Sequence, residues 1–222
     1  MNNRYLNLFL KIFVYIFGIF VLSFAAVLII RSGFGSGGWD AFNVNVSLLT
    51  NGKITVGMSS MMVGLTFLII VLSFRRKLKY LFSLFPILFT GSFIDLWNLV
   101  LLKNFNPTNV YLKTLIFIIA LFLLPLGLTI LIKTNLSPMV YDEFTFILMD
   151  VFKSNSFAKV RIAFEAFAIL MAIFIGLLHN GKFNEVSVGT FILSFLLGPI
   201  ISMWSNILDK FIIKLNIEKS LD

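Results

Sequence analysis

Residues 12–30 read IFVYIFGIFVLSFAAVLII, a run of 19 residues without a charged side chain. Lys11 precedes the run and Arg31 follows it. A helix of this length rises about 28 Å at 1.5 Å per residue, close to the roughly 30 Å hydrocarbon thickness of a bilayer. The run is too long for the apolar core of a secretion signal, and further apolar runs follow it. We therefore expect an uncleaved first membrane span.

Further apolar runs lie between charged residues along the chain, at positions 54–74, 80–102, 114–132, 162–178 and 186–208. The third run contains Asp95 and the fifth contains Glu165. Only helices and closed barrels satisfy their backbone hydrogen bonds in lipid, and runs of about 20 residues are helical. The predicted fold class is therefore all-α, a polytopic membrane protein with six transmembrane helices.

The composition supports a bilayer as the solvent. Of the 222 residues, 59% are hydrophobic, only 13% are charged and 27 are Phe, with a mean hydropathy of +1.00. A soluble domain is about one quarter charged. The net charge of +8 comes from short basic clusters between apolar runs, which indicates topology signals, so we expect no nucleic-acid partner. Without Cys, and with His179 as the single His, we expect no metal centre and no cofactor.

Lys and Arg placement predicts the orientation. The turn Arg75-Arg76-Lys77-Leu78-Lys79 is the strongest cytoplasmic marker in the chain. When this turn lies inside, both termini are also cytoplasmic, with 13 of the 18 basic residues inside and 5 outside. The reverse orientation would invert that ratio.

An internal repeat divides the chain. Residues 31–42, RSGFGSGGWDAF, align without gaps to residues 133–144, KTNLSPMVYDEF. Residues 91–97, GSFIDLW, similarly match residues 198–204, GPIISMW. Each copy occupies the corresponding span of its half, which predicts two three-span repeats, 1–105 and 106–222, in one membrane domain. Because each repeat has three spans, the second must have inverted topology.

Each repeat is expected to carry a helix break and a short helix after its first span. The residues expected to break the helices are Gly33, Gly35, Gly37, Gly38 and Pro138. Asp40 and Asp142 would then begin short helices. One interpretation is capping of these helices at a membrane surface. The other is that both segments enter the membrane from opposite faces and line a central site with Trp39, Asp40, Tyr141 and Asp142.

Two further sets of charged residues lie within apolar runs. Asp95 is either part of an ion or proton route, or is paired with Lys53 or Lys103 near the outer surface. Arg161 and Glu165 are spaced i,i+4 and can pair on one helix face. That pair is either structural or part of a solute or proton site.

The chain resembles the YczE/YyaS/YitT group of bacterial membrane proteins, and especially its YczE-like branch. The resemblance lies in the Gly-rich turn before Trp39-Asp40, Gly91 to Asp95, Ser137-Pro138, Val160-Arg161 to Glu165, and Leu197-Gly198-Pro199. This chain has Gly38 where the group usually has Pro before the first Trp-Asp, and Tyr141-Asp142 where small residues and Arg-Asp are usual. The resemblance implies a multi-pass protein of the bacterial cytoplasmic membrane and implies no particular activity.

Enzyme motifs are lacking. Tyr141-Asp142 matches one half of an intramembrane aspartyl protease site, but Gly37-Gly38-Trp39-Asp40 does not match the other half. There is no phosphate-binding loop and no Gly-x-Ser-x-Gly elbow. The sequence favours a secondary transporter or exporter of a small polar or ionic solute, with no enzymatic activity. The alternative is a non-transporting membrane protein that scaffolds, regulates or helps mature another membrane protein.

Overall fold

The computed structural model describes residues 2–137 and 140–219, and Pro138 therefore lies outside the described residues. All regular secondary structure in the described part is helical, and no strands occur there. Its elements are α1 (Asn2–Ser32), α2 (Gly38–Leu49), α3 (Val56–Arg75), the 3₁₀ helix η1 (Leu78–Ser83), α4 (Leu84–Asp95), the π-helical turn η2 (Leu96–Leu101), α5 (Val110–Thr134), α6 (Val140–Phe152), α7 (Phe157–Asn180) and α8 (Val188–Lys219).

Six of the described segments are long and apolar enough to cross a membrane, as the sequence predicted. They are Leu8–Ser32, Val56–Arg75, Leu78–Leu101, Val110–Thr134, Phe157–Asn180 and Val188–Lys210. Their outward surface is rich in Phe: Phe9 is 65% exposed, Phe74 is 62% exposed and Phe195 is 78% exposed. Exposed rings at this density suit contact with lipid, so the protein is a multi-pass membrane protein.

The third span is less regular than its apolar sequence suggests. It begins as η1, continues as α4 and ends as the π-helical turn η2. Pro86 lies in the first turn of α4, where its missing N–H has no helical partner to lose. The apolar run therefore predicted the span correctly but not its three local conformations.

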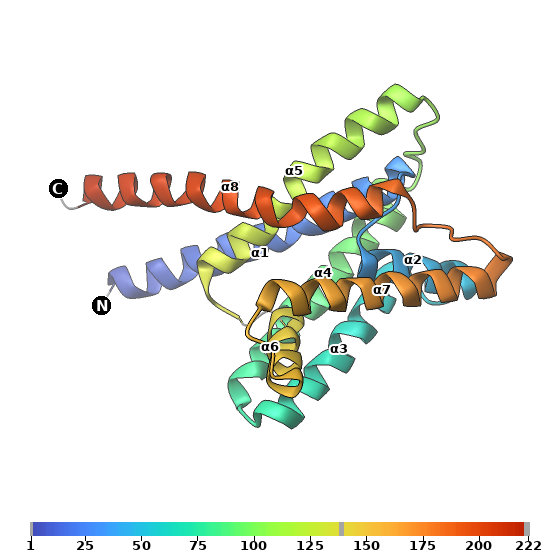
Figure 1. Ribbon diagram of the computed structural model, residues 1–222. Helices are drawn as coiled ribbons and strands as arrows, with labels where there is room; N and C mark the ends of the chain where they lie inside the picture. The colour runs from blue at the N-terminus through green and yellow to red at the C-terminus, as the bar shows by residue number, and fades with distance from the viewer. Residues whose placement is uncertain (1, 138–139, 220–222) are drawn as a thin grey trace.

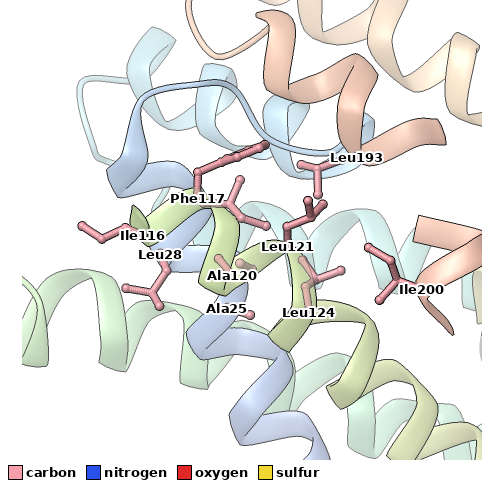
Figure 2. Packing of buried hydrophobic residues seen from close by; sticks show 11 residues of the cluster. Ala25, Leu28, Ile116, Phe117, Ala120, Leu121, Leu124, Leu193 and Ile200 are labelled. Carbon is pink, nitrogen blue, oxygen red and sulfur yellow. The ribbon is translucent and has the colours of Figure 1, made fainter. Parts of the chain in front are cut away.

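The centre of the fold is the crossing of α1 and α5 (Figures 1 and 2). Ala25 and Ala120 are fully buried there. A Cβ on Gly18 would lie 2.8 Å from Cγ2 of Ile130, and one on Gly127 would lie 2.8 Å from Cα of Leu22. Small residues let the two helices approach closely, which is how helices gain packing energy in a membrane.

The other helices attach to this central pair and to each other (Figure 1). The third span, α4, packs on α1, and the sixth, α8, packs on α5. Of the two short helices, α2 lies against α7 and α6 lies against α3. Each short helix therefore contacts a long helix of the opposite half of the chain.

Candidate functional site

The break after α1 requires glycine. Gly33 and Gly35 have φ of +72° and +94°, which L side chains rarely adopt. A Cβ on Gly35 would also lie 2.8 Å from the Oγ1 of Thr190 and 2.9 Å from the carbonyl oxygen of Glu185. Gly37 then caps α2, which begins at Gly38. The predicted break and short helix are therefore present in the first half.

In the second half, α5 ends at Thr134 and α6 begins at Val140. Asn135 caps α5 in the left-handed conformation, with φ of +50°. This is a position where Asn is the usual substitute for Gly. The predicted break is present here as well, and the residue that ends α5 is Asn135.

The two aromatic–Asp motifs lie together. The ring centroids of Trp39 and Tyr141 are 6.1 Å apart. Phe67 of α3 packs between them, with centroids 5.0 Å from Trp39 and 5.4 Å from Tyr141. Phe164 of α7 closes the cluster at 5.0 Å from Trp39. Residues 102 positions apart thus meet in one aromatic cluster at the starts of α2 and α6.

Charged groups lie on one side of this cluster. Nη1 of Arg161 is 2.9 Å from Oδ1 of Asp142, and its Nη2 is 3.2 Å from Oε1 of Glu165. A Cβ on Gly38 would be 3.2 Å from Oε2 of Glu165, so that carboxylate lies against the start of α2. The expected Arg161–Glu165 pair is present. Asp142 is a second partner, which the sequence did not reveal because it comes from another helix.

Glu185, in the connection between α7 and α8, is an acidic residue that sequence reasoning used only as the boundary of a span. Burial raises the pKa of its carboxyl to about 8, the nearby Ser36 hydroxyl lowers it in part, and the negative charge of Asp40 raises it further. Its Oε1 is buried and accepts no hydrogen bond from any described residue.

The position of Glu185 is fixed by Asn45 of α2, which is fully buried. Its side-chain amide donates to the carbonyl oxygen of Ala172 at 2.8 Å and accepts from the backbone N–H of Glu185 at 3.3 Å. One α2 side chain therefore joins α7 to the loop that follows it.

Asp95 lies apart from this cluster, at the opposite end of α3. Its carboxylate accepts hydrogen bonds from the hydroxyl of Thr55 and, at 2.8 Å, from the backbone N–H of Gly57. Among the described residues no salt bridge joins Asp95 to Lys53 or Lys103, which was one of the two alternatives; Asp95 instead caps the first turn of α3. A carboxylate there satisfies free N–H groups and interacts favourably with the helix dipole.

The basic turn after α3 is joined to α6. Nη1 of Arg75 is 2.8 Å from Oδ2 of Asp150, and the hydroxyl of Tyr80 donates to Glu143 at 3.0 Å. The Arg75–Asp150 pair fixes the C-terminal part of α6, whereas Tyr80 holds Glu143 in its first turn, beside the Asp142 that pairs with Arg161. Among the described residues no group of three or more His, Cys, Asp or Glu side chains could hold a metal ion.

The geometry defines a six-span membrane protein in which two broken segments meet beside the Arg161–Glu165 pair. Residues 9–206 match the family described as Family of unknown function (DUF6198), and the chain belongs to that family. It is 29% identical over 184 residues to the uncharacterized protein YyaS of Bacillus subtilis (strain 168), covering 83% of this chain and 90% of that protein. No solved structure matches. These findings confirm the resemblance to YyaS-like proteins.

Proposed function

We propose that the protein is a secondary transporter or exporter of a small polar or ionic solute. The observation that carries this proposal is that two aromatic–Asp motifs, one from each half of the chain, meet beside the Arg161–Glu165 pair: Trp39 lies near Tyr141, Asp142 pairs with Arg161, and Gly38 lies against Glu165. In broken-helix transporters, solute and coupling ions bind where helix ends from two inverted repeats meet.

The α1–α5 crossing supports an inverted repeat. The repeat alignment relates each residue of α1 to the one 102 positions later, as Arg31 to Lys133. The two helices are antiparallel, because Gly18 contacts Ile130 while Leu22 contacts Gly127. Extending this register about half a turn brings Ser23 opposite Pro125, which are equivalent residues in the alignment. A two-fold axis through the crossing would therefore exchange the halves in the register that the sequence repeat requires.

The matched tryptophans of the third and sixth spans support the same symmetry. Trp97 packs on Phe20 of α1 with ring centroids 4.7 Å apart. Its equivalent, Trp204, donates from Nε1 to the carbonyl oxygen of Phe122 of α5 at 3.0 Å. Phe20 and Phe122 are themselves 102 positions apart, so equivalent tryptophans contact equivalent residues.

We further infer that α2 and α6 are re-entrant. Helix α2 runs parallel to α7, because Gly38 lies against Ala168 and Asn45 lies against Gly176. Ala168 is 12 residues before the end of α7, which puts the start of α2 about 18 Å from that end. Tyr141, near the start of α6, lies against Phe67 of α3. Because Phe67 is eight residues before the end of α3, the start of α6 lies about 12 Å from that end. The N-terminal ends of both short helices would then meet near mid-membrane.

The charges of the site favour a cationic solute or protons as its cargo. Asp40, Asp142 and Glu165 are opposed by the single cation Arg161, together with the partial positive charges at the starts of α2 and α6. A proton or cation that neutralises Glu165 would leave Arg161 paired with Asp142 alone. This change of partner would couple binding to movement of α6 against α7.

The test is a solute screen followed by matched variants. Ligands would be found by thermal stabilisation of the purified protein, because a ligand that binds only the folded state raises its melting temperature. Flux of each hit would then be measured in proteoliposomes. Glu165→Gln and Asp40→Asn should lower flux at least tenfold with little change in melting temperature. Asp150→Asn is the control, because Asp150 is an exposed acid on α6, two turns beyond Asp142.

Unchanged flux in both site variants would overturn this site assignment. Failure of every solute and of protons to move, with an intact folded protein, would favour the alternative of a scaffold or regulator of another membrane protein.

A further inference from the structure

An apolar cavity of about 340 Å³ lies outside the central site. It is enclosed by the first half of α1, by η1 and the start of α4, and by Leu136 and Ser137 after α5. The α1 side chains Tyr15 and Ile19 are buried at its inner side, with exposed fractions of 8% and 0%. Its volume is in the range of small-molecule binding sites.

Hydrocarbon dominates the wall of this cavity. Eight of its ten lining residues are aliphatic or Phe, and the exceptions are Tyr15 and Ser137. A buried water needs two to four polar partners, so this lining would stabilise little water. Two lining residues, Phe82 and Phe85, are also more than half exposed on the outer surface of the third span. The cavity is therefore open to the lipid that surrounds the span.

Basic side chains flank the cavity at one membrane face. Lys11 immediately precedes the lining residue Ile12, Lys77 immediately precedes η1, and Lys79 lies in the first turn of η1. All three are exposed, and none takes part in a salt bridge between described residues. Exposed lysines without a carboxylate partner, at a membrane face beside an apolar cavity, complement an anionic lipid head group.

We propose that this cavity binds one acyl chain of an anionic phospholipid from the leaflet that faces Lys77 and Lys79. The phosphate of that lipid would lie near Lys11 and Lys79. The proposal does not depend on transport, because the cavity and the Arg161 cluster share no residue.

Native mass spectrometry of the detergent-purified chain tests whether an acyl chain occupies the cavity. Phosphatidylglycerol and phosphatidylcholine with identical acyl chains would be added in turn, and the lipid retained by the protein counted. Ile16→Trp would fill the cavity and should abolish retention of both lipids. Ile118→Trp is the matched control, because Ile118 is an exposed Ile on α5 that does not line the cavity. If Ile16→Trp fails to fold, Ile12→Trp, which also fills the cavity, should likewise abolish retention of both lipids.

The head-group part is tested by Lys11→Gln combined with Lys79→Gln. The unmodified chain should retain phosphatidylglycerol at least tenfold better than phosphatidylcholine. The double variant should retain both lipids about equally. Retention of lipid by folded cavity-filling variants at the level of the unmodified chain would overturn the proposal. Equal retention of the two lipids by the unmodified chain would overturn it as well.

Discussion

Arg161 of α7 lies 2.9 Å from Asp142 of α6, so a residue of the fifth span holds the start of a short helix that precedes it in the chain. The same guanidinium reaches Glu165 one turn further along α7. The side chains of Arg161 and Glu165 are only 27% and 25% exposed, so water would compensate little for the loss of the Arg161 cation.

Arg161→Ala should therefore destabilise the fold. The substitution leaves Asp142 and Glu165 close together without their common cation, and we expect a cost of about 1–3 kcal/mol. Thermal unfolding in detergent measures this. Lys159→Ala, two residues away on the exposed surface, is the control and should leave the melting temperature unchanged. Equal melting temperatures for the two variants would show that the ion pairs contribute nothing to stability.

Asp95→Ala should also reduce stability, by about 1–2 kcal/mol, because it removes the acceptor for Thr55 and Gly57 at the start of α3. The ion or proton route that the sequence offered as one interpretation of Asp95 predicts a loss of activity at unchanged stability. The capping geometry instead predicts a loss of stability. Melting temperature and proteoliposome flux, measured on the same preparations, decide between them: a specific loss of flux at unchanged stability would contradict the capping role.

Glu185 should make stability depend on pH. Its folded-state pKa of about 8 exceeds the ordinary value of 4.5, so the folded protein binds more protons than the unfolded chain between those values. Stability should therefore fall as the pH rises from about 4.5 to 8. Glu185→Gln should flatten this slope and add about 1–3 kcal/mol at pH 8, where the buried charge is otherwise present. The measurement is melting temperature against pH, and an unchanged slope in the variant would contradict it.

The sequence predicted the features that depend on local pattern. Apolar length predicted the six spans, glycine content predicted the break before α2, and i,i+4 spacing predicted the Arg161–Glu165 pair. It did not predict the contacts between distant segments. The hydrogen bond from Asn45 to Ala172 joins residues 127 positions apart, and neither residue type indicates such a contact. Likewise the position of Asp95 in an apolar run suggested an ion route. Its capping role was not predicted, because its partners Gly57 and Thr55 lie 38 and 40 residues away.

The orientation remains a prediction from charge. Reporter domains fused after residues 78 and 222 should be cytoplasmic, and reporters near 106 and 182 should be external. The reason is the basic turn at Arg75–Lys79 and the 13-to-5 distribution of basic residues. An external reporter after residue 78 would reverse the assignment of both membrane faces, including the leaflet assigned to the lipid site.

Re-entry of α2 can be tested with single cysteines, because the natural chain has none. Thr50→Cys, just after α2 ends, should react with a bulky membrane-impermeant thiol reagent added outside. Phe42→Cys should not react, because its position on α2 is close to the Trp39 cluster, where the rings of Trp39 and Phe42 have centroids 6.1 Å apart. Permeabilised membranes are the control for cysteine reactivity at Thr50, and denatured protein is the control for cysteine reactivity at Phe42. If both cysteines react equally in intact membranes, α2 is a surface cap, and Trp39 and Asp40 do not line a mid-membrane site.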